Sequence, residues 1–219
     1  MELIEGIETR RSCRAYKSDP VPEEIIRKIL ETAKWTPSFS DSQTWEVAVV
    51  TGRKKDELLE MLSGLVEKGT RPNPDIPMQP DWPSEVASRM KEHHAHHATY
   101  LEVKRGDEER RPRARRPDFY GAPCAVFLFI DKSLNEWSVF DTGAFAHSLC
   151  LAAHSYGIGS CLQAMMALYP DEIKKFLGIP ETKKLILGIS LGYPDTESAE
   201  YGYKSERMDL DEFVNWRTG

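Results

Sequence analysis

A short cluster of cationic and hydroxyl side chains stands near the start of the chain. Arg10, Arg11, Ser12 and Arg14 fall within five residues, directly after a segment that we expect to be a short helix, residues 2–10. A guanidinium group binds phosphate through two parallel hydrogen bonds, and a neighbouring hydroxyl adds another. The cluster therefore suits a bound anion. A solvated basic patch, or a set of ion pairs with nearby acidic residues, would use the same residue types.

Two further segments have the composition of a ligand-binding surface. Residues 37–45 read Pro-Ser-Phe-Ser-Asp-Ser-Gln-Thr-Trp, and their small polar side chains suit the rim of a planar heterocycle or a plain helix-to-strand loop. Residues 156–164 read Tyr-Gly-Ile-Gly-Ser-Cys-Leu-Gln-Ala. Here we expect a buried helix to end in a glycine turn whose backbone N–H groups are free to donate to a ligand, the alternative being an ordinary helix C-cap.

Two other clusters invite functions that the rest of the sequence does not favour. His93 and His97 are one helical turn apart, as zinc ligands can be, but no third ligand stands at a suitable spacing. We therefore expect no metal site, and interpret His93-His94-Ala95-His96-His97 as an exposed segment of a lid over a pocket. The second cluster comprises Arg110, Arg111, Arg113, Arg115 and Arg116. Its acidic neighbours favour a solvated connector over a nucleic-acid site.

The composition narrows the class of protein. The chain has 219 residues, of which 40% are hydrophobic, and a net charge of −6. This indicates one domain and excludes a general basic field for nucleic acid. The first residues lack the apolar core of a signal peptide, and no run approaches ~18 apolar residues. We therefore expect a cytoplasmic protein without a membrane span. The cysteines form no CxxC pair and are expected to be reduced and structural: Cys13, Cys124, Cys150 and Cys161.

The elements that must position these residues follow from hydrophobic periodicity. Beyond residues 2–10, helices are expected at 21–33, 54–66, 84–101, 139–156 and 170–177, and strands at 45–50, 122–130 and 184–191. Residues 71–83 carry five prolines and should form an extended excursion. The helix at 139–156 is apolar on nearly every side, which is typical of a domain centre or a subunit interface. No GxGxxG follows a strand, so a Rossmann domain is not expected.

The order of these motifs resembles the nitroreductase family over roughly residues 3–216. The resemblance rests on an Arg-Arg-Ser-x-Arg start, a Pro-Ser loop ending in Gln-x-Trp, an Ala-Pro strand and an Ala-rich helix closing at Gly-Ile-Gly-Ser-Cys. Leu-Gly-Ile-Pro and Leu-Gly-Tyr-Pro follow. Residues 119–123, 161–164 and 205–213 are similar to the nitrobenzoate reductase-like branch of that family.

This resemblance implies an α+β sandwich with a central, mostly antiparallel sheet flanked by helices. It implies a single FMN-binding domain over 1–219, with a helical lid at about 65–118. A C-terminal tail at about 201–219 would embrace the partner of an interlocked homodimer. The implied cofactor-binding residues are Arg10, Arg11, Ser12, Arg14, Pro37, Ser38, Phe39, Gln43, Cys161, Leu162, Gln163, Ala164 and Arg207.

By position in the family, residues 10–12 and Arg207 would hold the FMN phosphate, and Arg14 would face the pyrimidine edge of the ring. The loop residues Pro37, Ser38, Phe39 and Gln43 would come from the partner subunit. Residues 161–164 would offer backbone donors to the ring. Phe39 and Asp41 depart from the family's Pro-Ser-Ser-Gly-Asn-x-Gln-Pro-Trp. We expect Phe39 to narrow the pocket and Asp41 to disfavour an anionic reduced flavin.

The activity implied by the resemblance is an FMN-dependent oxidoreductase. It would take electrons from NAD(P)H and pass them to nitroaromatic or similar small aromatic or quinone acceptors in a ping-pong cycle. The flavin carries the chemistry, so no catalytic side chain is expected. Ene reduction, reductive dehalogenation and flavin breakdown occur on related scaffolds and stay open as alternatives. So does a flavin-binding sensor or storage protein without turnover.

Overall fold

The computed structural model describes residues 2–105 and 118–219 in two compact units. The first unit contains residues 2–78 and 118–201, and the second contains residues 79–105 and 202–219. The arginines at 110, 111, 113, 115 and 116 lie outside the described residues. The two units are considered separately below.

An antiparallel sheet forms the centre of the first unit. Its strands are β1 (Glu46–Thr51), β2 (Cys124–Asp131), β3 (Gly159–Gln163) and β4 (Lys183–Gly192), in the order β1-β2-β4-β3. All three strand pairs are antiparallel. The central strand β2 is buried from Cys124 to Ile130, as its continuous apolar sequence predicts. The expected α+β class with an antiparallel sheet is therefore confirmed.

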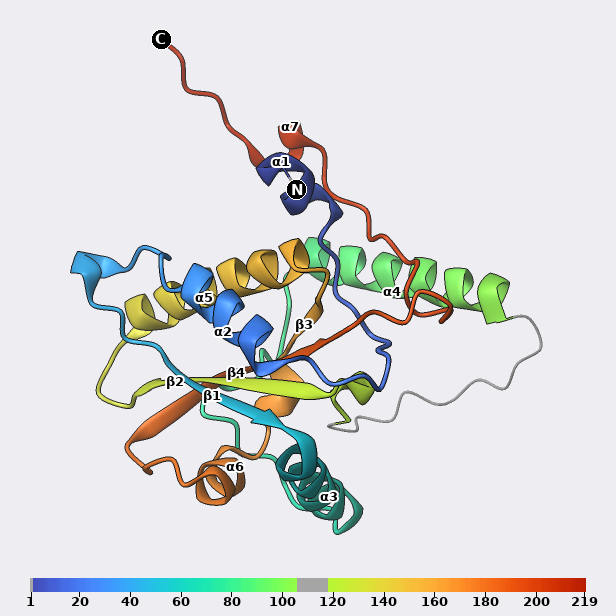
Figure 1. The fold of residues 1–219 in the computed structure, drawn as a ribbon. Helices are drawn as coiled ribbons and strands as arrows, with labels where there is room; N and C mark the ends of the chain where they lie inside the picture. The colour runs from blue at the N-terminus through green and yellow to red at the C-terminus, as the bar shows by residue number, and fades with distance from the viewer. Residues whose placement is uncertain (1, 106–117) are drawn as a thin grey trace. The chain divides into compact units, whose positions relative to one another are not determined.

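Helices cover both faces of this sheet (Figure 1). One face carries α2 (Glu23–Ala33) and α5 (Glu136–Ser155), and the other carries α3 (Gly52–Glu67) and α6 (Pro170–Leu177). Strand side chains alternate between the faces. Val126 and Leu128 therefore pack with α2 and α5, while Phe127 and Phe129 pack with α3 and α6. The short α1 (Leu3–Thr9) contacts α5.

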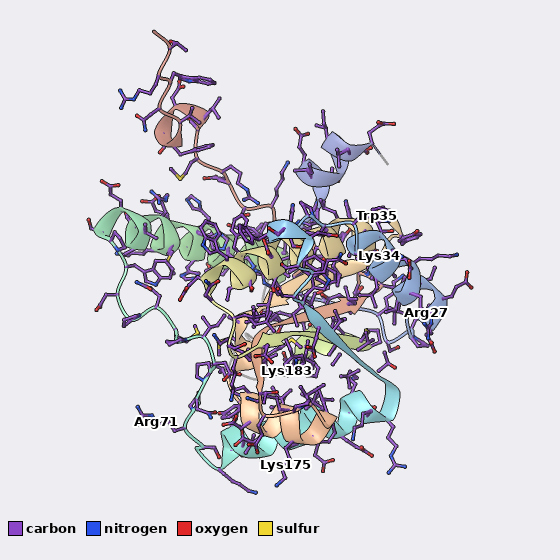
Figure 2. All side chains as sticks on the ribbon, turned by 90° about the vertical axis from the view of Figure 1, so that its left-hand side faces the viewer. Arg27, Lys34, Trp35, Arg71, Lys175 and Lys183 are labelled. Atoms are coloured by element: carbon purple, nitrogen blue, oxygen red, sulfur yellow. The ribbon has the colours of Figure 1, made fainter. Side chains whose placement is uncertain are left out.

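The helix α5 is buried on one side only within a single chain. Phe145 and Leu149 lie in the core, but Trp137 and Phe140 expose 65% and 68% of their surface. Trp35, just beyond the end of α2, is also exposed (Figure 2). The sequence predicted that this helix lies at a domain centre or at a subunit interface. Packing in the domain core accounts for one of its faces and leaves the other exposed.

The strand β3 was not expected. The sequence predicted a glycine stop at residues 157–159 and no strand after it, but residues 159–163 pair with β4 from Gly159 opposite Gly192 to Gln163 opposite Gly188. The turn is confined to Tyr156 and Gly157, whose φ is 73°. Gly159 serves close packing instead, because a Cβ built there would lie 2.8 Å from the Cys13 Sγ.

The proline-rich segment is anchored to the first unit by a buried ion cluster. Residues 71–83 form no helix or strand, as predicted. The Asp75 carboxylate accepts hydrogen bonds from the Leu185 N–H (2.8 Å) and from the Lys174 Nζ (3.4 Å). Lys174 on α6 is 1% exposed and also contacts Asp171 (3.0 Å) and the Lys183 carbonyl oxygen (3.2 Å). The next lysine along α6, Lys175, is exposed (Figure 2).

The second unit pairs a long helix with the C-terminal segment. The helix α4 (Ser84–Arg105) carries the histidine cluster, and Tyr203 packs on His97 with ring centroids 4.5 Å apart. His94 and His96 are exposed as expected, but His93 and His97 are half-buried against this tyrosine. The short α7 (Leu210–Phe213) begins with a capping box between Asp209 and Glu212. Among the described residues, no helix is long and apolar enough to span a bilayer.

Candidate functional site

Arg10 and Arg11 of the N-terminal cluster line a cavity of about 300 Å³ in the first unit, whereas Ser12 and Arg14 are not among the residues that line it. The residue after α1, Arg10, and its neighbour Arg11 form one wall. His154 near the end of α5 and the backbone around Gly157 and Ser160 form another. Pro194 and Tyr201 complete the lining, so three segments that are distant in sequence meet around one space.

Backbone hydrogen bonds fix the arginine cluster to the sheet. The chain leaves α1 at Arg10, whose N–H bonds to the Gly6 carbonyl oxygen at 3.1 Å. Ser12 then forms an isolated parallel bridge with Ser160 on β3, and the Cys13 N–H donates to the Ser160 carbonyl oxygen at 2.9 Å. The arginine cluster at residues 10–14 is thus joined to the segment 156–164 by main-chain contacts, which do not depend on side-chain rotamers.

The charges of Arg10 and Arg11 are not neutralised by acidic side chains. Both residues are half-buried, and neither forms an ion pair with a carboxylate within residues 2–105 and 118–219. The Arg11 guanidinium lies over the Tyr201 ring, 5.7 Å from its centroid. Two partly buried cations without a counter-ion make a positive cavity, which favours an anion. The alternative of ion pairs with nearby acids is therefore not observed for these two arginines.

His154 is a site residue that sequence reasoning missed. Its Nε2 lies 2.9 Å from the Thr9 Oγ1, and both residues line the cavity. Burial first, and then the charges of Arg10 and Arg11, lower the pKa of His154 from its ordinary value. Its position just before the glycine turn was the available sequence signal, but a histidine at the end of an apolar helix has no distinctive spacing.

The polar loop before β1 is held in a strained conformation. Ser40, Asp41 and Gln43 have φ of 50°, 55° and 45°, in the left-handed region that side chains disfavour. The Phe39 N–H donates to the buried Asp141 carboxylate of α5 at 2.9 Å. Such strain persists only where surrounding contacts impose it, and it concentrates at functional sites. Asp141 is a second residue that the sequence did not single out.

The side chains of this loop also bond to one another. The Ser38 Oγ accepts from the Gln43 N–H, and the Asp41 Oδ1 accepts from the Gln43 Nε2, both at 2.9 Å. Phe39 leaves 71% of its surface exposed. The carboxylate that replaces the family's amide at position 41 is thus engaged within its own loop.

The predicted donors on β3 face in different directions. Cys161 and Gln163 are buried, and the Gln163 Nε2 donates to the Ser190 Oγ on β4. Leu162 between them is 44% exposed. Ala164 begins the short 3₁₀ turn Ala164–Ala167. The side chain of Gln163 is committed to the sheet, so only its backbone remains for a ligand.

Two of the predicted groups lie near opposite ends of α5. The loop 37–43 contacts Asp141 in its first turns, whereas the cationic cavity includes His154 in its last. Thirteen residues of helix separate them by about 20 Å. One chain therefore does not gather the whole predicted cofactor set into one place.

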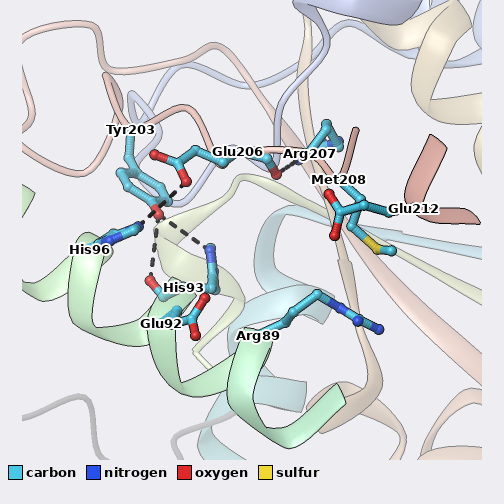
Figure 3. A pocket seen from close by; sticks show the side chains of 9 residues that line it. All are labelled: Arg89, Glu92, His93, His96, Tyr203, Glu206, Arg207, Met208 and Glu212. Carbon is cyan, nitrogen blue, oxygen red and sulfur yellow. Dashed lines mark hydrogen bonds and ion pairs between the residues drawn. The ribbon is translucent and has the colours of Figure 1, made fainter. Parts of the chain in front are cut away.

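Arg207 lies in the second unit, in a separate cavity of about 240 Å³ (Figure 3). Its Nη1 donates to the Ser205 Oγ at 2.6 Å and to the Glu206 carbonyl oxygen at 2.9 Å. The Glu206 carboxylate is 3.7 Å from the His96 Nδ1, and Arg89 lies on the helix wall of the same cavity. Arg207 and the N-terminal arginines thus belong to different units.

The thiols belong to the core. The four cysteines, all within the described residues, are buried and form no disulfide. Burial raises the pKa of Cys124 to about 12, which keeps that thiol protonated and unreactive. In the described residues, no group of three histidine, cysteine, aspartate or glutamate side chains is arranged to hold a metal ion.

Comparison with known proteins places this geometry in a family. The model of the nitroreductase family matches residues 7–193. A relative named nitroreductase NfnB, from Mycolicibacterium smegmatis, is 34% identical over 216 residues, which cover 96% of this chain and 89% of that protein. A 4-nitrobenzoate reductase from Pseudomonas putida is 29% identical over 212 residues, covering 96% and 93%.

Solved structures agree with the sequence comparison. The crystal structure of the FMN-dependent nitroreductase NfnB from Mycobacterium smegmatis in complex with NADPH has a TM-score of 0.86 and 31% identity, and covers 98% of this chain and 97% of that one. The FMN- and NADPH-dependent NfnB of a Sphigopyxis strain, at 24% identity and a TM-score of 0.90, shows the shared fold. The resemblance stated from the motifs is confirmed, and the chain belongs to the nitroreductase family.

Proposed function

We propose that the protein is an FMN-dependent oxidoreductase that uses NAD(P)H to reduce nitroaromatic or similar small aromatic or quinone acceptors. The observation that carries this proposal is the cavity in which Arg10 and Arg11 have no carboxylate partner among the described residues. The relatives support it, since one is described as FMN-dependent and bound to NADPH and another as a 4-nitrobenzoate reductase.

The residues of the cavity fit the phosphate end of FMN. Guanidinium and hydroxyl groups are the donors that a phosphate monoester needs, and no acidic side chain is among the described residues that line the space. Arg10, Arg11 and Ser12 would hold the phosphate together with Arg207. Arg14, whose Nη1 now donates to the Ser12 carbonyl oxygen at 3.4 Å, would turn to the pyrimidine edge of the ring.

When bound, FMN supplies a ring that accepts a hydride from NAD(P)H and gives electrons to the acceptor. The protein's part is to bind the flavin, to orient the reductant and the acceptor against it, and to exclude water. Arg14 would favour negative charge at the pyrimidine edge, as a preorganised donor favours an oxyanion. Phe39 would narrow the cleft that reductant and acceptor occupy in turn, which is the basis of the ping-pong order. No side chain is assigned a catalytic proton transfer.

The proposal includes an interlocked homodimer in the cytoplasm. Because the loop 37–43 and the cationic cavity lie about 20 Å apart along α5, a complete site would combine the cavity of one protomer with Pro37, Ser38, Phe39 and Gln43 of another. The exposed Trp137 and Phe140 offer an apolar surface for that association. We treat 1–219 as one FMN-binding domain whose lid spans about 65–118 and whose tail spans about 201–219.

The test is the spectrum of the purified protein and its response to reductant. We expect a yellow protein that releases FMN on denaturation, bleaches with NADPH and regains colour with 4-nitrobenzoate or a quinone. FAD, or no flavin after reconstitution with excess FMN, would contradict the cofactor. Bleaching without turnover on any acceptor would contradict the oxidoreductase and favour a sensor.

A further inference from the structure

His154 lines the cationic cavity, and its hydrogen bond identifies which ring nitrogen is free. The Thr9 hydroxyl donates its only hydrogen to the Glu5 carbonyl oxygen at 2.6 Å. It must therefore accept at its contact with His154, 2.9 Å away, so the imidazole hydrogen is on Nε2. Nδ1 is the nitrogen left to take up a proton. The imidazole is thus held in place by α1 while its basic atom is available.

The charged groups that act on His154 come from α1 and from the residues that follow it. Arg10 and Arg11 act on it from the residues after α1, and Glu5 acts from α1 itself with the opposite sign. Cys13 and Tyr201 also line the cavity. Burial and the two arginines outweigh Glu5 and lower the pKa of His154, so the ring is neutral near pH 7 while no anion is present. The negative charge of an anion in the cavity raises the pKa of His154 and so opposes the effect of the arginines.

We propose that His154 is a further cationic ligand of the phosphate group in this cavity, beside the arginines, and that it takes up a proton from solvent when the phosphate binds. The inference rests on the proposed function, because FMN is the phosphate monoester that would fill the cavity. A phosphate near pH 7 carries about −1.5 to −2 charges. An opposite charge at contact range shifts a pKa by roughly 1–3 units toward the charged form.

The sign of the pH dependence follows from linkage. His154 has a higher pKa in the FMN complex than in the free protein. Its contribution to FMN affinity is therefore fully present below the free-state pKa and is lost as the pH rises through the bound-state pKa. The phosphate's own second ionisation, near pH 6, works in the opposite direction. This effect of phosphate ionisation is the same for the parent and its variants, so it cancels in the ratio of their FMN affinities.

The experiment compares FMN titrations of the parent and His154→Gln between about pH 6 and pH 8.5. Glutamine keeps an N–H donor for Thr9 but cannot be protonated. We expect the parent to lose about tenfold more FMN affinity than the variant over this range. Calorimetry in two buffers of different ionisation enthalpy should show greater proton uptake by the parent. His147→Gln, an exposed histidine on the same helix, should behave as the parent.

Titrations with riboflavin and with inorganic phosphate distinguish the contribution of the phosphate group to binding from that of the ring. Riboflavin affinity should have the same pH dependence in the parent and His154→Gln, and inorganic phosphate should compete with FMN but not with riboflavin. Equal FMN pH slopes in the parent and the variant would overturn the inference and leave the proposed function standing. Failure of the parent to bind either flavin would overturn both.

A spectroscopic measurement on the parent keeps the inference testable if the variant does not fold. In histidine-labelled protein, the NMR titration of His154 should move to higher pH when FMN is added. Riboflavin should leave that titration unchanged. An unchanged titration with FMN bound would overturn the inference.

Discussion

Arg10 carries the clearest prediction for a single side chain. Arg10→Ala removes a guanidinium that has no acidic partner in the described structure. Each charge-assisted contact to one phosphate contributes about 1.5–3 kcal/mol, so FMN affinity should fall by about one to two powers of ten. Fluorescence titration measures this, with riboflavin as the control because it lacks the phosphate.

Arg207→Ala tests whether the C-terminal tail, residues 201–219, binds the same phosphate as Arg10. We expect a similar loss of FMN affinity, unchanged riboflavin binding and an effect that is not additive with Arg10→Ala, since the two contacts would share one anion. If Arg207→Ala binds FMN as tightly as the parent, or loses both flavins equally, the assignment of Arg207 to the phosphate is wrong.

Lys174 governs stability rather than binding. Burial works to lower the pKa of Lys174, but its hydrogen bond to Asp171 and the charges of Asp75 and Asp171 raise it overall. The ammonium therefore stays charged, and its contribution is lost only as the pH rises above 10.5 toward the folded-state pKa. Lys174→Met leaves the Asp75 carboxylate without its ammonium partner and should lower the free energy of unfolding by about 3 kcal/mol.

Urea denaturation measures that loss, and Lys175→Met is the matched control. Lys175 is the next residue on α6 and is exposed, so its replacement should change stability by less than about 0.5 kcal/mol. Equal stability of Lys174→Met and the parent would show that the buried cluster contributes nothing net.

Residue types predicted part of the site but not its internal partners. Arg10 and Arg11 could be singled out from the sequence because clustered guanidinium groups suit a phosphate, although a solvated basic patch uses the same residue types. His154 and Asp141 could not, because their importance arises from contacts with Thr9 and Phe39 that are far away in sequence. No local pattern encodes such a pairing.

At the scale of elements, Asp141 links a helix to the strained loop 37–43. Asp141→Ala removes the acceptor of the Phe39 N–H, which should destabilise the loop by about 1 kcal/mol. Hydrogen exchange at the Phe39 amide should then be roughly fivefold faster. Asp141→Asn keeps an acceptor oxygen and should preserve the protection. An unchanged exchange rate in Asp141→Ala would show that this bond does not hold the loop.

The elements with strong periodicity were predicted closely, and the exception has a physical reason. The expected strands at 45–50, 122–130 and 184–191 match β1, β2 and β4 within a few residues. The sequence of β3, Gly-Ser-Cys-Leu-Gln, has no alternation and starts with a turn-forming residue. It is a strand because β4 and Ser12 flank it, so tertiary pairing overrides local propensity.

At the scale of the whole molecule, the central expectation is the homodimer. Phe140→Asp places a charge on the exposed apolar side of α5, where burial of an aromatic side chain contributes roughly 1.5–3 kcal/mol. The dissociation constant should therefore rise by at least about tenfold, and FMN affinity should fall with it because each site would lose its partner loop. Sedimentation velocity measures the change.

Val66→Asp is the control, since Val66 is an exposed residue in the last turn of α3, which covers the opposite face of the sheet. It should leave the parent's dimer intact. A parent that is monomeric at micromolar concentration would contradict the homodimer. A Phe140→Asp protein that dimerises like the parent would place the interface elsewhere.

The bridge between Ser12 and Ser160 also sets the order in which the protein can become functional during folding. The arginines emerge early from the ribosome, but the wall that faces them is built from residues some 148 positions later, in a strand that pairs along its length with the still later β4. Contacts of such long sequence separation form late. The nascent chain therefore has no preformed anion cavity, and cofactor loading must follow closure of the sheet.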